Sequence, residues 1–521
     1  MQTSFSRRQR VHKPAIESNG GIVAAQNRAA AQAGAAVLAG GGNAVDAAVA
    51  TGLAAGVLEP WMSGIGGGGI MLVYQAHEDR VRAFDFGMRA PAALDPADYP
   101  IVEGEDTDLF GWPLVKEGRN LRGATAVAVP GHVDGLATVL EACGSISWKA
   151  ALAPATLLAE QGVTFDWFTL LQIAQHTADL DRDPVSREIY LDNGYPPSAL
   201  NQPRSLPNPR LLPTLRRLAA AGPRDFYEGE IARGLVADLR AAGGCHSAED
   251  LAGYRTVEVE PLEVAHGDCR LSVLPELNGG PTLARAIHRL EGEPFAALPD
   301  AKFFLSCAEA LREAFGHRLL HLGDEDGHRG PSCTTHLSVV DREGNMVALT
   351  QTLLSVFGSK VTLPTSGVLM NNGINWFDPR PGRPNSLAPG KRPLSNYVPV
   401  IGHGGGRRFA IGASGGRKII PAMTQLSLML GVCGMELETA LCHPRIDVSD
   451  PDRVAYDPRL SPDIVANLER VHSAEPAHCG VAPNNYGIVS AVLRENGRNQ
   501  GAVDPCHPWA EAVAEEEAES P

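Results

Sequence analysis

The stretch Ser332-Cys333-Thr334-Thr335-His336-Leu337-Ser338-Val339-Val340 decides how the whole chain is interpreted, because it contains a candidate cleavage point. Cutting the bond between Cys333 and Thr334 would turn an internal threonine into an N-terminal one. A threonine hydroxyl is a poor nucleophile without a base beside it. The free α-amino group of the same residue, with an unperturbed pKa of about 7.7–8.0, can be that base. The cut would create nucleophile and base together, which predicts an inert chain that activates itself.

A β-hairpin is predicted around this threonine. Its first strand, its turn and its second strand are residues 337–340, 341–345 and 346–352. If the turn residues are unpaired, Val340 faces Met346, and the same register places Thr334 opposite Thr352. Cross-strand partners have Cβ atoms about 4.5–5.5 Å apart, so the Thr352 hydroxyl could hydrogen-bond the nucleophile. From the spacing alone, an ordinary threonine pair at the end of a sheet is the more common explanation.

A second candidate site lies in the segment 412–420, which joins a predicted strand at 409–411 to a predicted helix at about 420–433. Its consecutive glycines, Gly415 and Gly416, would leave backbone N–H groups unpaired and unshielded at the start of a helix. Such groups can hold a developing oxyanion. A tight strand-to-helix connection is the alternative explanation of the two glycines.

Composition narrows the class of protein. The chain has 521 residues, of which 44% are hydrophobic and 20% charged, and its net charge of −15 argues against nucleic acid or an anionic membrane as partner. Nine cysteines without a Cys-x-x-Cys motif predict reduced thiols in a cytoplasm, with no metal cage and no disulfide framework. The basic N-terminus has no apolar segment behind it, and no stretch approaches the roughly 20 apolar residues of a membrane span.

A glycine run, 66–69, precedes the predicted strand 70–74. A dinucleotide-binding loop requires a strand, then the glycines, then a helix, and this order is not met. Close packing of the backbone is therefore the expected role of these glycines.

Taken together, the ordered motifs resemble the γ-glutamyltranspeptidase family. They run from about Val23 to Cys506, essentially the whole chain. They are Gly-Gly-Asn-Ala-Val-Asp-Ala-Ala-Val-Ala at 41–50, Glu-Pro at 59–60 with the Ser-Gly-Ile-Gly-Gly-Gly-Gly that follows, Val-Pro-Gly at 129–131, Phe-Tyr-Glu-Gly-Glu-Ile-Ala at 226–232, Thr-Thr-His at 334–336, Phe-Gly at 357–358, Leu-Met-Asn-Asn at 369–372 and Lys-Arg-Pro-Leu-Ser at 391–395.

The resemblance implies an α+β fold, the four-layer αββα sandwich of the N-terminal nucleophile hydrolases. It implies self-cleavage before Thr334 into a large subunit, 1–333, and a small subunit, 334–521, which stay together as one intertwined heterodimer; a dimer of such units is possible. By position, Thr334 is the nucleophile, Thr352 its hydrogen-bonding partner, and Gly415 with Gly416 the oxyanion pair. The family mechanism needs no cofactor or metal, and its substrate is a small amide.

The residues that would bind the glutamyl group match the family less well. The family's arginine for the α-carboxylate aligns with Gly87. Arg89 lies two residues further on, a spacing that returns to the same face of a strand, so Arg89 is the candidate replacement. Ser395 matches the first of two residues that contact the substrate carboxylate. The remaining departures are Leu354 for an expected asparagine, Trp376 within the segment that replaces acidic or amide residues, and Asn396 for the second serine.

These departures leave the acyl group open. Leu354 and Trp376 cannot pair with an ammonium group as an amide and a carboxylate would; Trp376 could offer a cation–π contact, but a role as pocket wall is more common. The leading hypothesis is a threonine amidohydrolase or acyltransferase for γ-glutamyl compounds such as glutathione. The alternatives are an acylase for another carboxyacyl amide, of the glutaryl-cephalosporin or oxamate type, and a non-processing pseudoenzyme that binds a metabolite.

Overall fold

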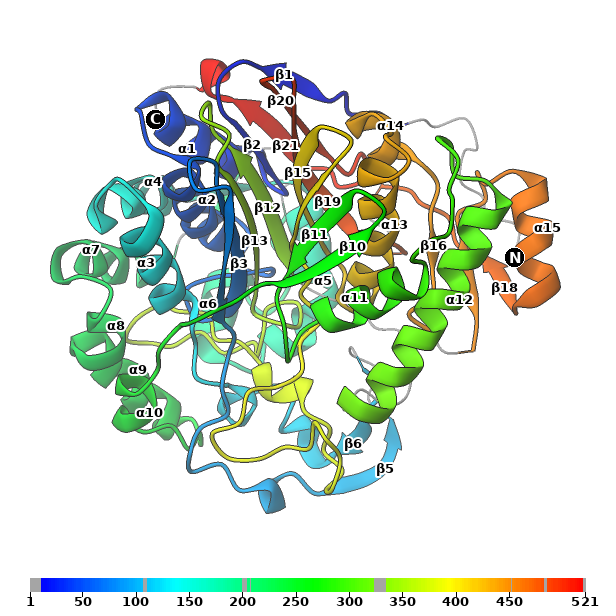
Figure 1. Ribbon diagram of the computed structural model, residues 1–521. Helices are drawn as coiled ribbons and strands as arrows, with labels where there is room; N and C mark the ends of the chain where they lie inside the picture. The colour runs from blue at the N-terminus through cyan, green and yellow to red at the C-terminus, as the bar shows by residue number, and fades with distance from the viewer. Residues whose placement is uncertain are drawn as a thin grey trace.

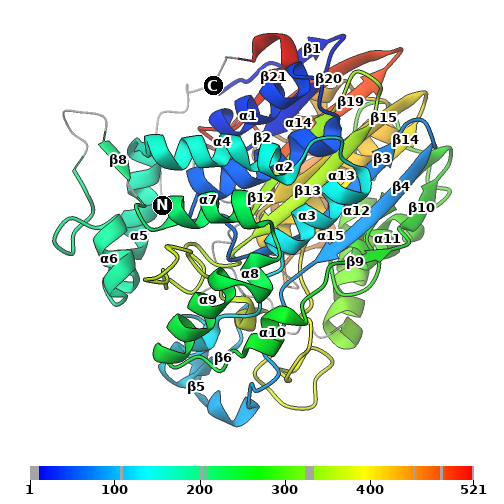
Figure 2. The same ribbon diagram turned by 90° about the vertical axis from the view of Figure 1, so that its left-hand side faces the viewer.

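Two antiparallel sheets stacked face to face form the centre of the computed structural model (Figure 1). The structure describes residues 11–105, 110–198, 204–206, 208–322, 334–450, 452–481 and 485–518. Helices cover the outer face of each sheet, so the layers follow the order helix, sheet, sheet, helix, as the resemblance implied. The view in Figure 2 looks onto the helices that cover one of these sheets.

Each central sheet has seven strands. The first sheet has the order β21 (Glu511–Ala514), β2 (Ile22–Ala25), β12 (Thr335–Val340), β13 (Met346–Thr352), β3 (Gly68–Gln75), β4 (Arg80–Phe86) and β9 (Val257–Val259). The second sheet has the order β1 (Ile16–Ser18), β20 (Arg498–Val503), β19 (Ile488–Glu495), β15 (Arg407–Ser414), β14 (Val400–Gly404), β11 (Cys269–Val273) and β10 (Leu262–His266).

The outer helices fall into two groups. The first sheet is covered by α1 (Arg28–Ala39), α2 (Ala44–Leu58), α3 (His132–Cys143), α4 (Trp148–Gln161), α7 (Leu211–Ala221) and α9 (Glu230–Ala241). The second sheet is covered by α11 (Gly280–Arg289), α12 (Ala301–His317), α13 (Ile419–Gly431), α14 (Leu437–Cys442) and α15 (Pro462–Val471). In Figure 1 the two groups lie on opposite sides of the sheets. Among the described helices, none is long and apolar enough to cross a bilayer.

Smaller elements complete the chain. They are α5 (Trp167–Leu180), α6 (Pro184–Tyr190), α8 (Asp225–Glu228), α10 (Ala248–Ala252), the pairs β5 (Ile101–Glu105) with β6 (Pro113–Val115) and β7 (Val163–Phe165) with β8 (Arg204–Leu206), and a sheet of β16 (Ile446–Asp447), β17 (Val454–Tyr456) and β18 (Ala474–Pro476). Short helical turns are η1 (Pro96–Asp98), η2 (Lys116–Gly118), η3 (Ala124–Ala126), η4 (Arg318–Leu322), η5 (Gly373–Trp376), η6 (Gly416–Lys418) and η7 (Glu515–Glu517).

Strand alternation divides the core into three parts. Leu337 and Val339 of β12 face α1 and α2, whereas Val340 packs between the two sheets. In β15, Phe409 and Ile411 face the helices of the other outer layer, and Ala410 packs between the sheets. Since successive side chains of a strand point to opposite faces, even-numbered residues of β12 and β15 face each other across the sandwich.

The predicted hairpin register is confirmed. Val340 pairs with Met346, and the ladder runs without interruption to Thr335 opposite Gln351. β12 lies between β2 and β13, and β13 lies between β12 and β3. Elements from before and after Thr334 therefore alternate within one sheet, which suits the predicted intertwined subunits 1–333 and 334–521.

The glycine run also has the predicted packing role. A Cβ at Gly67 would clash with the Thr352 carbonyl oxygen, and a Cβ at Gly66 would clash with that of Leu369. The Gly66 carbonyl in turn accepts hydrogen bonds from the amide and the side chain of Asn371. Glycine is needed here because the backbones approach so closely.

Candidate active site

Thr334 and Thr352 lie at the same end of the hairpin. Thr334 directly precedes β12 and Thr352 ends β13, so the observed register places them opposite each other. Both side chains are buried. Because side chains alternate along a strand, these even-numbered residues lie on the face that looks toward the second sheet. The next pair on this face is His336 and Thr350, and a hydrogen bond of 2.9 Å joins His336 Nδ1 to Thr350 Oγ1. Cys333, the other half of the predicted cleavage point, lies outside the described residues.

The Thr352 hydroxyl is oriented by the loop that follows β13. Its oxygen accepts a hydrogen bond from the Leu354 amide at 2.8 Å, so its own hydrogen points to another acceptor. Leu354, Phe357 and Lys360 have φ angles of 84°, 59° and 64°, a left-handed conformation that costs energy for such residues. Concentrated strain of this kind is typical of functional loops.

Asn372 holds this strained loop in place. Its side-chain oxygen accepts the Ser355 amide at 3.0 Å, and its side-chain nitrogen donates to the Ser355 hydroxyl and to the Leu121 carbonyl at 2.7 and 3.0 Å. The side chain is completely buried. The Asn371-Asn372 motif therefore serves the backbone around Thr352.

The turn at Gly415 and Gly416 lies at the same end of the sandwich as Thr334. In the second sheet, β15 ends at Ser414, and the helix α13 begins at Ile419, close to the predicted position. A Cβ at Gly412 would clash with the His336 ring, so these strands are in contact. Gln26, which follows β2 on the side where β12 begins, donates to the Ser414 hydroxyl at 2.8 Å.

Both glycines are conformationally suited to expose their amides. Their φ angles are 133° and 60°, values that favour glycine. Neither amide donates a hydrogen bond to another residue within the described ranges. Unpaired N–H groups just before the N-terminus of α13 can stabilise a negatively charged oxygen. The assignment of Gly415 and Gly416 as the oxyanion pair stays a prediction that this geometry favours.

A buried polar layer lies on the opposite face of the hairpin. Thr335 faces the helices, and the Glu59 carboxyl at the end of α2 interacts with it. Burial raises the pKa of Glu59 to about 7, and the Thr335 hydroxyl offsets part of that rise. Neither carboxyl oxygen has a hydrogen-bond partner of normal geometry in the described part of the chain. The sequence carried a signal that was missed, since a glutamate directly follows the mainly apolar last three turns of α2.

The same layer continues through Gln351, the strand partner of Thr335. Its side-chain oxygen accepts a hydrogen bond from His132 Nε2 at 2.8 Å. Its side-chain nitrogen donates to the Gly52 carbonyl at 2.9 Å and to the Ser63 hydroxyl at 3.0 Å. Burial lowers the pKa of His132 to about 4, so its ring is neutral at pH 7. The start of β12 is therefore supported by a fixed polar network.

A cleft of about 300 Å³, including its open mouth, contains some of the predicted substrate-binding residues. Trp376 and Ser395 line it together with Arg392, whose guanidinium pairs with Asp85 at 2.8 Å. Trp376 is buried against Tyr397, with ring centroids 5.4 Å apart, and so acts as a wall. Asn396 is buried beside Ser395 but is not part of the lining.

Arg89 is not placed as expected. The premise that a strand continues through residues 87–89 is wrong, because β4 ends at Phe86. The Asp85 side chain accepts the Gly87 amide at 2.7 Å, a local turn that ends the strand. Arg89 instead forms an isolated bridge with Val129, and it does not line the cleft. Its role as a carboxylate ligand stays a prediction.

Sequence reasoning missed Arg318. Its side chain is fully buried at the end of α12, and one guanidinium nitrogen donates to the Ser395 carbonyl at 2.8 Å and to the Asn396 side chain at 2.9 Å. The other donates to the Asn278 carbonyl at 2.9 Å. Arg318 thus fixes the predicted substrate-binding residues Ser395 and Asn396 in place.

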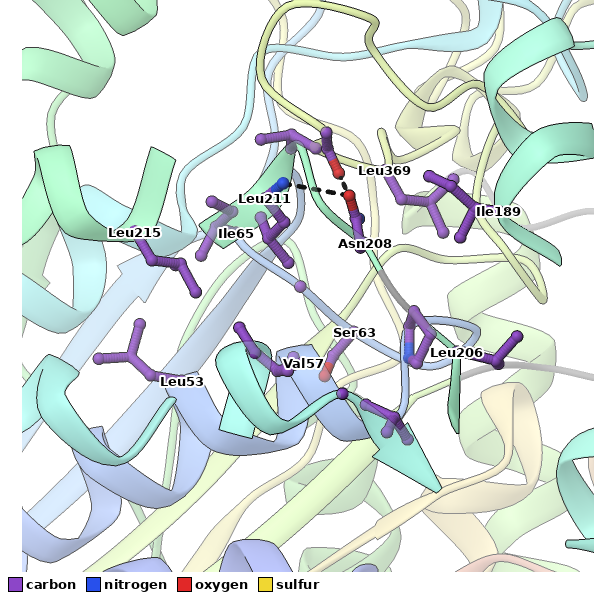
Figure 3. Close-up of a pocket in the computed structure, with 18 of the residues that line it drawn as sticks. Leu53, Val57, Ser63, Ile65, Ile189, Leu206, Asn208, Leu211, Leu215 and Leu369 are labelled. Atoms are coloured by element: carbon purple, nitrogen blue, oxygen red, sulfur yellow. Dashed lines mark hydrogen bonds between the residues drawn. The ribbon is translucent and has the colours of Figure 1, made fainter. Parts of the chain in front are cut away.

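A larger cavity, of about 740 Å³ including its open mouth, lies elsewhere (Figure 3). Its wall is mainly apolar, with Leu53, Val57, Leu215 and Leu369 among its residues. None of the predicted catalytic or substrate-binding residues lines it. It is therefore distinct from the cleft that contains Trp376 and Ser395.

Comparison with known proteins agrees with this arrangement. The family model described as γ-glutamyltranspeptidase matches residues 30–333 and 327–514. The chain belongs to the γ-glutamyltranspeptidase family. A glutathione hydrolase proenzyme of Pseudomonas sp. (strain A14) is 32% identical over 94% of this chain and 93% of its own length. The acylase ACY 1 proenzyme of Pseudomonas sp. (strain V22) is 33% identical over 83% of each chain.

Solved structures confirm the fold. The crystal structure of cephalosporin acylase from Bacillus halodurans superposes with a TM-score of 0.84 over 99% of both chains, at 24% identity. That of Helicobacter pylori γ-glutamyltranspeptidase gives a TM-score of 0.51 at 26% identity, covering 58% of this chain and 84% of that one. The αββα fold of the N-terminal nucleophile hydrolases, expected from the sequence, is confirmed.

Proposed function

We propose that this chain is a self-processing threonine amidohydrolase that cleaves γ-glutamyl amides such as glutathione through an acyl-enzyme on Thr334. The observation that carries the proposal is the meeting of Thr334, Thr352 and the Gly415–Gly416 turn at one end of the sandwich, in a chain of this family. Relatives named glutathione hydrolase proenzyme support both the self-processing and the substrate.

The catalytic cycle follows from the positions of these groups. The Thr334 hydroxyl attacks the amide carbonyl carbon, and the α-amino group of Thr334 accepts the proton. The Gly415 and Gly416 amides stabilise the oxyanion, while the Thr352 hydroxyl donates to the nucleophilic oxygen. The amine product leaves with the proton, and an acyl ester on Thr334 remains. Water, or an acceptor amine, then releases the acyl group.

The same hydroxyl performs the maturation step. In the precursor it attacks the carbonyl carbon of Cys333, which converts the peptide bond into an ester and frees the Thr334 amine. Hydrolysis of that ester leaves the fragments 1–333 and 334–521. Because β12 and β13 lie between β2 and β3, the fragments remain interlocked as a heterodimer.

A second candidate function is an acylase for a different carboxyacyl amide. Two positions favour it, because Leu354 and Trp376 are buried apolar groups that cannot pair with an α-ammonium group. An apolar wall accepts an acyl chain without an α-ammonium group more readily than one that carries it. The relative named acylase ACY 1 proenzyme is as similar in sequence as the glutathione hydrolase proenzyme.

Intact mass spectrometry tests the common part of both functions. The wild-type protein should give two fragments that meet between Cys333 and Thr334. The Thr334→Ala variant should give one full-length chain, and Thr334→Ser, which keeps a hydroxyl, should still split. An unbroken wild-type chain would contradict self-processing and favour the binding-scaffold alternative.

A matched pair of substrates separates the two functions. A γ-glutamyl anilide and a glutaryl anilide differ only in the α-amino group of the acyl chain. A higher kcat/KM for the γ-glutamyl anilide supports the leading proposal. A higher value for the glutaryl anilide supports the acylase. The Thr334→Ala variant is the control for background hydrolysis of both.

We also propose a cytoplasmic location. It is supported by the cysteines, since none of the eight described ones forms a disulfide. Cell fractionation with an antibody to the small fragment tests this, and recovery in the secreted or periplasmic fraction would contradict it.

A further inference from the structure

Two cysteines that are distant in sequence meet in the segments that follow β18 and β20. The Sγ atoms of Cys479 and Cys506 are 3.3 Å apart, although the residues are separated by 27 positions. Cys479 lies between β18 and β19, and Cys506 follows β20. Both side chains are partly exposed. A disulfide has an S–S bond of about 2.05 Å, so bond formation requires an approach of about 1.2 Å.

The surroundings make the two thiols unequal. The hydrogen bond from the Cys506 thiol lowers the pKa of Cys479 and raises the pKa of Cys506. The positive charge of Arg445 also lowers the pKa of Cys479, whereas the negative charges of Asp504 and Asp457 raise it. Arg459 is close to both sulfurs and pairs with Asp457, and Lys13 acts on Cys506. A thiolate beside a second thiol is the arrangement of a nucleophilic and a resolving cysteine.

We propose that Cys479 and Cys506 are a redox-active dithiol that forms a reversible disulfide by exchange with a small-molecule disulfide. The Cys479 thiolate attacks one sulfur of the small disulfide, forms a mixed disulfide and releases one thiolate. Cys506, deprotonated to solvent, then attacks the Cys479 sulfur and releases the second thiolate. Two protein thiols become one disulfide, and the small disulfide is reduced to two thiols.

This link would tether a loop that reaches the predicted oxyanion turn. Tyr486 Oη donates to the Ala477 carbonyl at 2.9 Å, and Asn485 donates to the His478 carbonyl at 2.7 Å, so the two ends of the Cys479 loop are joined. A Cβ at Gly415 would lie 3.2 Å from the Gly487 Cα. Gly487, which directly follows the Tyr486 anchor, thus packs against Gly415.

The other end of the link is firmly anchored. The Cys506 amide donates to the Asp504 carboxylate at 2.9 Å, and Asp504 pairs with the buried Arg445 at 3.1 Å. Lys13 donates to the His507 carbonyl at 2.6 Å and also to the Ala510 carbonyl. Oxidation would therefore fasten the Cys479 loop to a rigid segment.

Thiol counting tests the proposal independently of any amidase activity. The purified protein is reduced, then incubated with bis(2-hydroxyethyl) disulfide, which has no γ-glutamyl amide, and its remaining thiols are alkylated and counted by mass. We expect two fewer alkylated thiols, a linked peptide pair containing Cys479 and Cys506, and full recovery with reductant. Cys506→Ser should trap the mixed disulfide on Cys479. Cys245→Ser, in another partly exposed cysteine, should leave the link intact.

Full alkylation after oxidant, or a link through other cysteines, would overturn the proposal. Hydrogen exchange tests the tether. Amide exchange at residues 485–489 should slow on oxidation in the wild type and stay unchanged in Cys506→Ser. Equal exchange in the oxidised and reduced wild type would overturn the coupling to Gly415. A protein that forms the link but never self-cleaves would contradict only the proposed function.

Discussion

The nucleophile end and the substrate cleft of this molecule differ in how they are built. At the nucleophile end, Thr334, Thr352, Gly415 and Gly416 are positioned by strand register and by a strand-to-helix turn. In the cleft, Ser395 is held by a remote buried arginine, Arg318.

The difference indicates which part of the chemistry can change. A hydroxyl pair and two amides that depend on backbone geometry persist as long as the sheets persist. Side chains that line a cleft can be exchanged while the sheets remain intact. The pair of relatives named glutathione hydrolase and acylase, at nearly equal identity, fits this division. We therefore expect changes at the nucleophile end to affect every substrate, and changes in the cleft to affect selectivity.

The largest expected effect is that of Thr352→Ala. Loss of the hydroxyl removes the proposed donor to Thr334 and the observed acceptor of the Leu354 amide. Removal of one such donor lowers kcat by about 10²- to 10³-fold. The loss should be equal for γ-glutamyl and glutaryl anilides, and Thr352→Ser should retain most of the activity. A loss confined to one substrate would break the proposed division between the two ends.

A change in stability is expected at Glu59, behind the nucleophile. Burial raises the pKa of this carboxyl from 4.5 to about 7, so the folded state keeps a proton that the unfolded state releases. The stability due to this proton is complete below pH 4.5 and is lost as pH rises to about 7. The difference amounts to about 3 kcal/mol. In the uncleaved Thr334→Ala background, Glu59→Gln should raise the melting temperature above that of its parent at pH 8. At pH 4 the two melting temperatures should be equal.

The control for this measurement is Glu141→Gln, which changes an exposed carboxyl on α3. Its melting temperature should follow that of the parent at both pH values. If Glu59→Gln gave the same pH profile as this control, Glu59 would be charged in the folded state. The polar layer beneath Thr335 would then contain an ionised carboxylate.

The sequence predicted the nucleophile end better than the cleft for a physical reason. Counting along a hairpin is reliable, because side chains alternate with a period of two, and Thr352 could be placed by that count. Arg89 could not, because the Asp85 side chain ends β4 by capping the Gly87 amide. Arg318 and its partner Ser395 are 77 positions apart, so no local pattern connects them. The pairing of Cys479 with Cys506 was hidden for the same reason.

A smaller effect is expected from Leu354→Asn, which tests acyl selectivity in the strained loop that follows Thr352. Leu354 stands where the family has an asparagine, and its φ of 84° suits asparagine better than leucine. A hydrogen bond to a charged group contributes about 1.5–3 kcal/mol. The ratio of kcat/KM for γ-glutamyl over glutaryl anilide should therefore rise about tenfold or more. Leu354→Ala, which adds no amide, should leave the ratio unchanged; an equal rise there would indicate extra space as the cause.

The smallest effect is expected from Arg318→Lys, which also tests whether the two regions are separable. Lysine keeps the charge but cannot span the Ser395 carbonyl, the Asn396 side chain and the Asn278 carbonyl as the guanidinium does. Loss of about 1 kcal/mol of positioning energy should raise KM about fivefold with little change in kcat. Arg318 also begins the η4 turn, the last described element before Thr334. If Arg318→Lys slowed self-cleavage and left KM unchanged, Arg318 would belong to the maturation machinery, and the division between the two regions would fail.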